Sequence, residues 1–351
     1  MQWVQEADGV FRGGGVKGIA LAGALEGFAD HPTKPVTKWV NVAGASAGAI
    51  IACYLAMGRT AGEMTTLLRR TDFSQFEDFP RGSRLLAVEN LMRKRGLAHG
   101  RAFEEWFDSV LEGATFERVA KEPEGGKDRD WHLKLIAVDV TNRDLLVLPD
   151  DLVCYREPGK PGLIDPDGFS IARAARMSMS IPYFFEPVEL DHKDHGRSLI
   201  IDGGTLSNFP VWLFDVDPAV VGRPPRRPTF GFTLTGGRGF GAGLGMVNRL
   251  VPWSVRFAFD IFATAQEAWD KRFVSHSTRV RTLAVDADDV GTTDFKISED
   301  KQQLLLTNGR RAARGFLDEF KLEDYMNTYH ASPVAMQQTP AAAESRTAVQ
   351  R

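Results

Sequence analysis

The stretch Val42–Ile50 reads VAGASAGAI and sets one serine, Ser46, among glycines and alanines. It joins an apolar run at 38–44, which predicts a buried strand, to a second run that predicts a buried helix. A nucleophile on a sharp strand-to-helix turn needs small residues two positions away on either side, because larger side chains would collide with the strand and the helix. Gly44 and Gly48 occupy those positions. The pattern alone leaves two interpretations, a close-packed turn or a serine exposed for chemistry.

A second glycine-rich segment, RGGGVKG at residues 12–18, also lies between a predicted strand and a predicted helix. The spacing of a phosphate-binding loop is absent. A dinucleotide-binding turn, which Gly13, Gly15 and Gly18 would match, also requires an acidic residue about 20 positions further on, and the sequence HPTKPVTKW has none there. The remaining interpretation is an oxyanion hole formed by the backbone N–H groups of Gly13, Gly14 and Gly15. Lys17 either orients this loop, attracts an anionic head group, or is an ordinary solvated lysine.

A third segment, LIIDGGTLSNFP, places Asp202 at the end of a predicted apolar strand, followed by Gly203 and Gly204. A carboxylate at this end of a strand is suited to a site at the sheet edge, although an Asp-Gly pair also commonly caps a turn. His276 follows Ser46 and Asp202 in the chain order of an α/β-hydrolase triad. Two mechanisms therefore remain open, a Ser46–Asp202 dyad and a Ser46–Asp202–His276 triad.

The composition is typical of a globular protein with a sizeable core. The 351 residues are 43% hydrophobic and carry a net charge of −3, which gives no basic field for nucleic acid. Only two cysteines occur, and no Cys/His cluster has the spacing of a zinc site, so we expect no disulfide framework, metal or cofactor.

Strand-like and helix-like segments alternate along the chain. This alternation predicts an α/β fold with a central, mainly parallel sheet covered by helices on both faces, in three layers. We expect one domain over residues 1–330. The tail 331–351 is low in aromatic residues and rich in Ala, Gln, Thr and Pro, which predicts disorder.

The N-terminus lacks the basic and apolar pattern of a signal peptide. The most apolar long stretch, Val247–Trp269, is interrupted by charged residues and proline, so it does not predict a membrane span. It is either a core helix that covers a groove or a surface that touches lipid. We therefore expect a cytoplasmic protein that visits membranes at most peripherally.

Taken together and in this order, the three motifs resemble those of the patatin-like phospholipases. That family carries a glycine-rich oxyanion loop, then Gly-x-Ser-x-Gly, then Asp-Gly-Gly or Asp-Gly-Ala. The segments GVKGIALAGALE, ARMSMSIPYFFEPVEL and IDGGTLSNFPVWLF also resemble bacterial members. The similarity is good over residues 8–216 and fainter up to about residue 320. The C-terminal part, residues 217–330, would complete or cover the domain. Arg12 is a small departure, because small or acidic residues are usual before the glycines.

The resemblance implies a patatin-like fold and a serine lipid acyl hydrolase that needs no histidine. Ser46 would be the nucleophile, Asp202 the general base, and Gly13 to Gly15 the oxyanion donors. The substrates would be acyl esters of phospholipids or other glycerolipids, and Leu85–Met92 together with Val247–Trp269 would line an acyl groove. The alternatives are a His276-dependent esterase or thioesterase and a non-catalytic lipid-binding relative. Oligomeric state is left open.

Overall fold

The computed structural model describes residues 3–80, 84–122, 129–215, 227–236, 280–292 and 294–330, together with residues 253, 257, 261 and 264. The predictions for His276 and for the tail 331–351 concern residues outside these ranges, as does most of Val247–Trp269.

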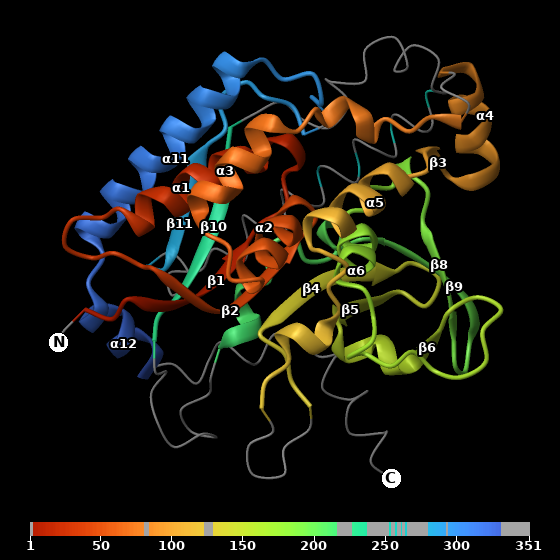
Figure 1. The fold of residues 1–351 in the computed structure, drawn as a ribbon, viewed down its shortest axis with the longest axis horizontal. Helices are drawn as coiled ribbons and strands as arrows, with labels where there is room; N and C mark the ends of the chain where they lie inside the picture. The colour runs from red at the N-terminus through yellow and green to blue at the C-terminus, as the bar shows by residue number, and fades with distance from the viewer. Residues whose placement is uncertain are drawn as a thin grey trace.

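One half of the main sheet is parallel. Nine of the strands that the structure describes form this sheet in the order β11-β10-β1-β2-β4-β9-β8-β6, with β5 paired to β4. The first five run parallel to one another (Figure 1). Their bounds are β11 Thr282–Asp286, β10 Thr229–Thr235, β1 Glu6–Phe11, β2 Lys38–Ala45 and β4 Leu133–Asp139.

The other half of the sheet is antiparallel. It contains β5 Asp144–Leu148, β9 Gly196–Asp202, β8 Val188–His192 and the two-residue β6 Tyr155–Arg156. β3 Gly96–Ala98 and β7 Tyr183–Phe185 pair with each other in a separate two-stranded sheet. The sequence predicted a mainly parallel sheet. That holds for the half that carries the VAGASAGAI turn, and β4 joins the two halves.

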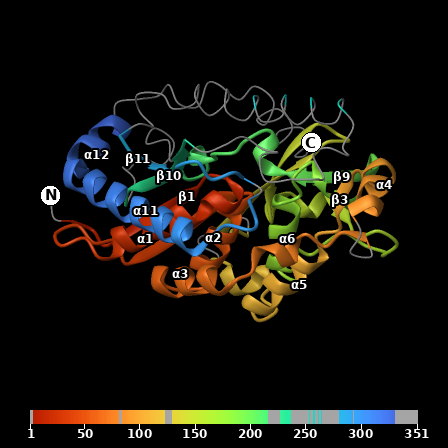
Figure 2. The ribbon, with the colours of Figure 1, turned by 90° about the horizontal axis from the view of Figure 1, so that it is seen from above.

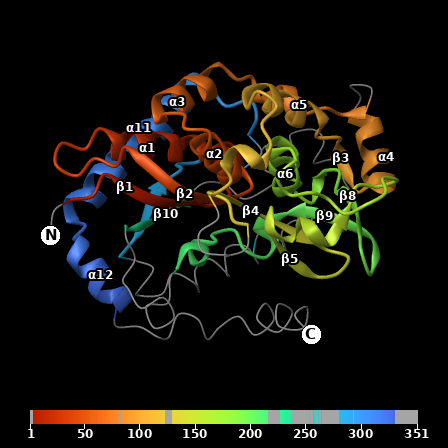
Figure 3. The same cartoon turned by 60° about the horizontal axis from the view of Figure 1, so that its bottom comes forward.

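The described helices gather on one face of the parallel half (Figures 2 and 3). They pack their apolar sides on the strands in one large core, in which residues such as Phe11, Leu25, Phe28 and Leu306 are fully or almost fully buried. The helices of this face and its neighbourhood are α1 Ile19–Ala29, α2 Ala47–Ala56, α3 Ala61–Arg70, α5 Arg101–Val110, α6 Ile171–Ser178 and α11 Glu299–Glu319. α4 Arg84–Lys94 and α12 Leu322–His330 lie at opposite ends of the molecule (Figure 1).

On the opposite face, the described cover is a short segment after β9. Phe209 and Val211 pack there against Val10 of β1 and Ala43 of β2 in a small separate cluster. The described residues thus show helices on one face and this segment on the other, so the prediction of helices on both faces stays a prediction.

Local signals in the sequence are well reproduced. Thr60 and Glu63 have the spacing of a capping box in the sequence, and α3 begins with a complete one. The Thr60 hydroxyl accepts from the Glu63 N–H, and the Glu63 carboxylate accepts from the Thr60 N–H. Two short helical turns extend the glycine segments, Gly15–Gly18 ahead of α1 and Gly203–Thr205 after β9.

Candidate active site

The topology of the sheet brings Ser46 and Asp202 together at one place. β2 runs parallel to β4 and its last residue, Ala45, pairs with Ile136. β9 runs antiparallel to β4 and its last residue, Asp202, pairs with the next residue, Ala137. β2 and β9 therefore approach each other end to end along β4, and consecutive positions of a strand are only about 3.3 Å apart.

Ser46 stands on a strained turn between β2 and α2. Its φ of 54° and ψ of −128° form a combination that side-chain-bearing residues rarely adopt. The side chain is buried, with 5% of its surface exposed. The Ser46 carbonyl accepts a hydrogen bond from the Ala49 N–H at 2.9 Å, so the turn passes directly into α2.

The two motif glycines are required by close approach of the backbone. A Cβ atom at Gly44 would clash with the carbonyl of Gly48, and one at Gly48 would clash with the carbonyl of Phe11 at the end of β1. The small residues around Ser46 therefore let β1, β2 and α2 meet, as the sequence interpretation requires.

The glycine-rich loop lies against the serine. A Cβ atom on Gly13 would stand 2.8 Å from the Cβ atom of Ser46. The N–H of Gly13, however, donates to the carbonyl of Asn208 at 3.2 Å, so this donor is already occupied. Gly15 has a φ of +57° and packs against the carbonyl of Thr292. Of the three amides expected from the sequence, those of Gly14 and Gly15 are the better candidates for an oxyanion hole.

Asp202 is a buried carboxylic acid with a perturbed pKa. Burial, with 1% of its surface exposed, raises the pKa of Asp202 from 3.8 to about 7, against the lowering effect of hydrogen bonds from Ser46 and from the Gly204 N–H. The Gly204 N–H donates to Oδ1 at 2.7 Å, whereas Oδ2 is buried without a partner of regular hydrogen-bond geometry. The Ser46 hydroxyl thus lies close enough to influence the carboxylate without a fully formed bond, as catalytic pairs without substrate commonly do.

Sequence reasoning missed the residues that hold this pair. Ser178, the last residue of α6, contacts the backbone of Ser46, Ser180 contacts that of Asp202, and Asn208 contacts the glycine loop. The only indication in the sequence was that these polar residues lie in largely apolar segments.

Within the described residues, which do not include His276, no histidine is among the hydrogen-bond partners of Ser46 or Asp202. In the same residues, no group of three or more His, Cys, Asp or Glu is arranged to hold a metal ion. Nor does any helix in the described part of the chain have both the length and the apolar character needed to cross a membrane.

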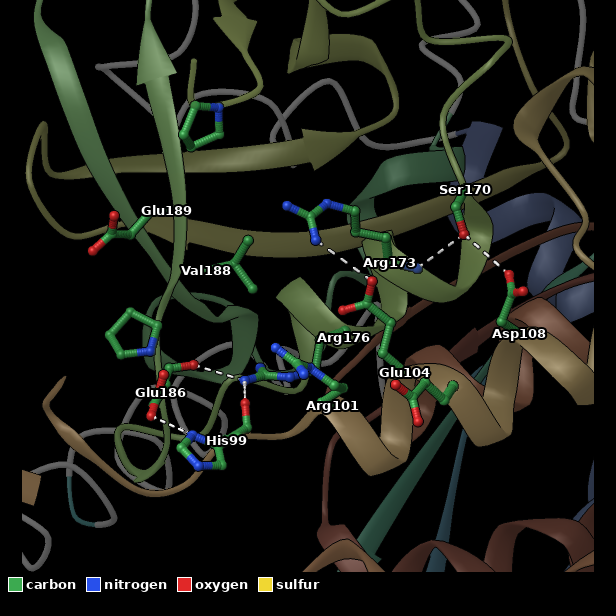
Figure 4. A pocket seen from close by; sticks show the side chains of 13 residues that line it. His99, Arg101, Glu104, Asp108, Ser170, Arg173, Arg176, Glu186, Val188 and Glu189 are labelled. Carbon is green, nitrogen blue, oxygen red and sulfur yellow. Dashed lines mark hydrogen bonds and ion pairs between the residues drawn. The ribbon is translucent and has the colours of Figure 1, made fainter. Parts of the chain in front are cut away.

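A cavity of about 730 Å³ lies between α5, α6 and β8 (Figure 4). Its lining is charged with both signs and includes Arg101, Arg173, Glu104 and Glu189, but neither Ser46 nor Asp202. Arg173 is held by Glu157 and Glu104. An acyl chain in this cavity would separate charged side chains of the lining from water, which is unfavourable.

Comparison with known families decides the classification. A model described as patatin-like phospholipase matches residues 9–215. The chain belongs to the patatin-like phospholipase family. Its match contains all three sequence motifs and ends just after the segment that packs beneath β1 and β2.

Two related sequences and two solved structures extend the comparison. The YqhO protein of Bacillus subtilis (strain 168) is 36% identical over 321 residues, which are 89% of this chain and 98% of YqhO. The R571 protein of Acanthamoeba polyphaga mimivirus is 25% identical over 205 residues, 58% of this chain and 60% of R571.

VipD from Legionella pneumophila is similar in structure with a TM-score of 0.49 and 16% identity, over 90% of this chain and 67% of VipD. Full-length ExoU from Pseudomonas aeruginosa has a TM-score of 0.44 and 15% identity, over 90% of this chain and 53% of that one. The family assignment rests on the sequence matches.

Proposed function

We propose that this patatin-like protein is a serine acyl hydrolase that cleaves acyl esters of phospholipids or other glycerolipids with a Ser46–Asp202 dyad. The observation that carries the proposal is the end-to-end approach of β2 and β9, which sets a strained serine beside a buried carboxylate whose pKa is raised to about 7. A base with a pKa near the working pH is far more effective than a free aspartate.

Acylation begins when Asp202 accepts the proton of the Ser46 hydroxyl and Ser46 Oγ bonds to the carbonyl carbon of the ester. The carbonyl oxygen becomes an oxyanion, for which the N–H groups of Gly14 and Gly15 are the proposed donors. The positive end of the α2 dipole, next to Ser46, adds to this stabilisation. When the tetrahedral intermediate collapses, the ester C–O bond breaks and Asp202 returns the proton to the leaving alcohol.

Deacylation repeats the same steps with water. Asp202 takes a proton from water, the hydroxyl oxygen attacks the acyl carbon, and the C–O bond to Ser46 breaks. Ser46 regains its proton from Asp202 and a carboxylic acid is released. The reacting groups in both steps are Ser46, Asp202, the ester and water.

A lipid-facing surface is supported by four described positions of Val247–Trp269. Trp253, Phe257, Ile261 and Thr264 are helical and exposed, and the first three recur at intervals of four residues. The rings of Trp253 and Phe257 stack with centroids 5.4 Å apart and planes 4° apart. Exposed aromatic and aliphatic side chains on one helix face suit the interface of a lipid bilayer. Transient contact of the enzyme with a lipid surface is therefore part of the proposal.

The decisive experiment measures hydrolysis of a p-nitrophenyl ester series and of a phospholipid by the wild type, Ser46→Ala, Asp202→Asn and His276→Ala at neutral pH. We expect Ser46→Ala and Asp202→Asn to abolish turnover of every ester and His276→Ala to keep it. Loss of activity in folded His276→Ala would favour the triad. A wild type inert on every ester would favour the non-catalytic, lipid-binding alternative.

A further inference from the structure

The turn that ends α6 contacts the backbone of both dyad residues. The Ser46 N–H donates to Ser178 Oγ at 3.1 Å, and the same hydroxyl donates to the carbonyl of Ile136 on β4 at 2.6 Å. Two residues later, the Ser180 carbonyl accepts from the Asp202 N–H at 2.9 Å. Ser178 and Ser180 are both fully buried.

The hydroxyl of Ser178 satisfies the backbone N–H of Ser46, the residue that follows β2 on the strained turn. The hydroxyl can accept that N–H and donate to Ile136 at the same time, because it carries one donor and two acceptor lone pairs. Ile136 is the β4 residue that pairs with Ala45, so the bridge fixes the nucleophile relative to the strand that aligns the dyad.

A buried arginine fixes this turn in place. Arg176 donates to Ser180 Oγ at 2.5 Å and to the carbonyl of Gly100 at 3.0 Å. It also donates to the carbonyls of His99 at 2.8 Å and Glu186 at 2.7 Å (Figure 4). Its guanidinium also stacks on the Phe185 ring at 5.1 Å. Arg176 thus anchors the turn to two other segments, around His99 and around Glu186, which suits a rigid support for a strained residue.

We infer that Ser178 is a positioning residue of the proposed hydrolase: its hydroxyl holds the Ser46 backbone in the conformation that directs Oγ toward Asp202 and the substrate. This inference rests on the proposed function. Ser178 does not touch the reacting atoms, and acts through the N–H of Ser46.

The test is stopped-flow reaction of the full-length protein with a p-nitrophenyl alkylphosphonate, which forms a stable bond to an activated serine and releases p-nitrophenol. The amplitude of p-nitrophenol release gives the number of folded sites that react. The rate constant of this release reports how well Ser46 is positioned and activated. A change that only destabilises the fold lowers the amplitude, whereas mispositioning lowers the rate constant. We compare the wild type with Ser178→Ala, Ser178→Thr and the control Ser198→Ala.

Ser198, on β9, is a matched control because it is as buried as Ser178. Its hydroxyl also accepts one hydrogen bond, from Asn142 Nδ2 at 2.9 Å. We expect Ser178→Ala to lower the rate constant tenfold to about a hundredfold, the size of effect that a small misplacement of a reacting group produces. Ser178→Thr, which keeps the hydroxyl, should stay within about threefold of the wild type. Ser198→Ala should change the rate constant less than twofold.

A rate constant for Ser178→Ala within tenfold of the wild type would overturn the inference and leave the proposed function standing. An equally slow Ser178→Thr, or an equally slow Ser198→Ala, would overturn it as well. If Ser178→Ala fails to fold, Ser178→Cys replaces it under the same tenfold criterion, because a thiol accepts hydrogen bonds only weakly. A wild type that releases no p-nitrophenol would refute the proposed function itself.

Discussion

Replacing Asp202 by asparagine should abolish catalysis and yet stabilise the fold as the pH rises. Burial raises the pKa of Asp202 from 3.8 to about 7, so the folded chain ionises this group only near neutrality, whereas the unfolded chain ionises it in acid. Below pH 3.8 the carboxyl group is protonated in both states, so its ionisation contributes no difference in stability. Between pH 3.8 and 7 the wild type loses stability progressively, and above pH 7 the loss is complete.

The magnitude follows from the separation of the two pKa values. Each pH unit corresponds to about 1.4 kcal/mol, so the displacement to about 7 corresponds to about 4 kcal/mol in full. About 3 kcal/mol of this should develop between pH 5 and pH 8. Asparagine does not ionise, so the variant lacks this pH dependence of the unfolding free energy. Its amide N–H groups face a site with few acceptors, which costs about 1–3 kcal/mol at every pH.

The assay is equilibrium urea unfolding of the wild type and Asp202→Asn at pH 5, 6, 7 and 8. The difference in unfolding free energy, variant minus wild type, should rise by about 3 kcal/mol across this range, whatever its value at pH 5. Ser46→Ala is the control, because it removes the neighbouring hydroxyl and keeps the carboxylate, and it should show no such rise. A difference for Asp202→Asn that stays constant with pH would refute the raised pKa and, with it, the base assigned to Asp202.

The remaining predictions concern activity, the glycine loop, one helix cap and the lipid surface. With a soluble ester, kcat/KM should rise with an apparent pKa of about 7, since Asp202 must be ionised to accept a proton; a profile already flat at pH 5 would contradict this. Gly15→Ala should reduce activity in the same ester assay at least a hundredfold, because the φ of Gly15 is +57° and the new methyl group would meet the Thr292 carbonyl. Gly58→Ala is the control, since Gly58 has a φ of +74° but lies in open space, and this variant should keep full activity. Thr60→Ala should lower the urea-unfolding free energy by about 1 kcal/mol without changing kcat, and a loss near zero would mean that the capping box is inert. Trp253→Ala should weaken sedimentation with phosphatidylcholine vesicles but leave short-ester turnover intact, and equal losses in both assays would argue against a lipid contact.

Local features of the site could be predicted from the sequence because they depend on neighbouring residues. The turn at Ser46 needs Gly44 and Gly48, and the capping box needs only Thr60 and Glu63. Each signal lies within a few positions, so the expected strands and helices agree with the structure near them.

Long-range features could not be predicted. The sequence placed Asp202 at the end of a strand, but not the antiparallel direction of β9, which makes it meet β2 end to end. Nor could it reveal that the Gly13 N–H donates to the carbonyl of Asn208, or that the Ser46 N–H donates to the hydroxyl of Ser178. Such contacts between distant segments follow from strand order, which hydrophobic periodicity does not encode.

The meeting of β2 and β9 on β4 has a consequence for the timing of activity during synthesis. Ser46, the proposed nucleophile, is present once residue 46 is made. β9, which ends with the proposed base Asp202, comes much later and must pair with β4, which is made before it. Contacts between such distant segments form late, because closing a long loop is costly in entropy. A nascent or truncated chain that ends before β9 therefore carries Ser46 without Asp202, and the proposed dyad forms only after both halves of the sheet have joined.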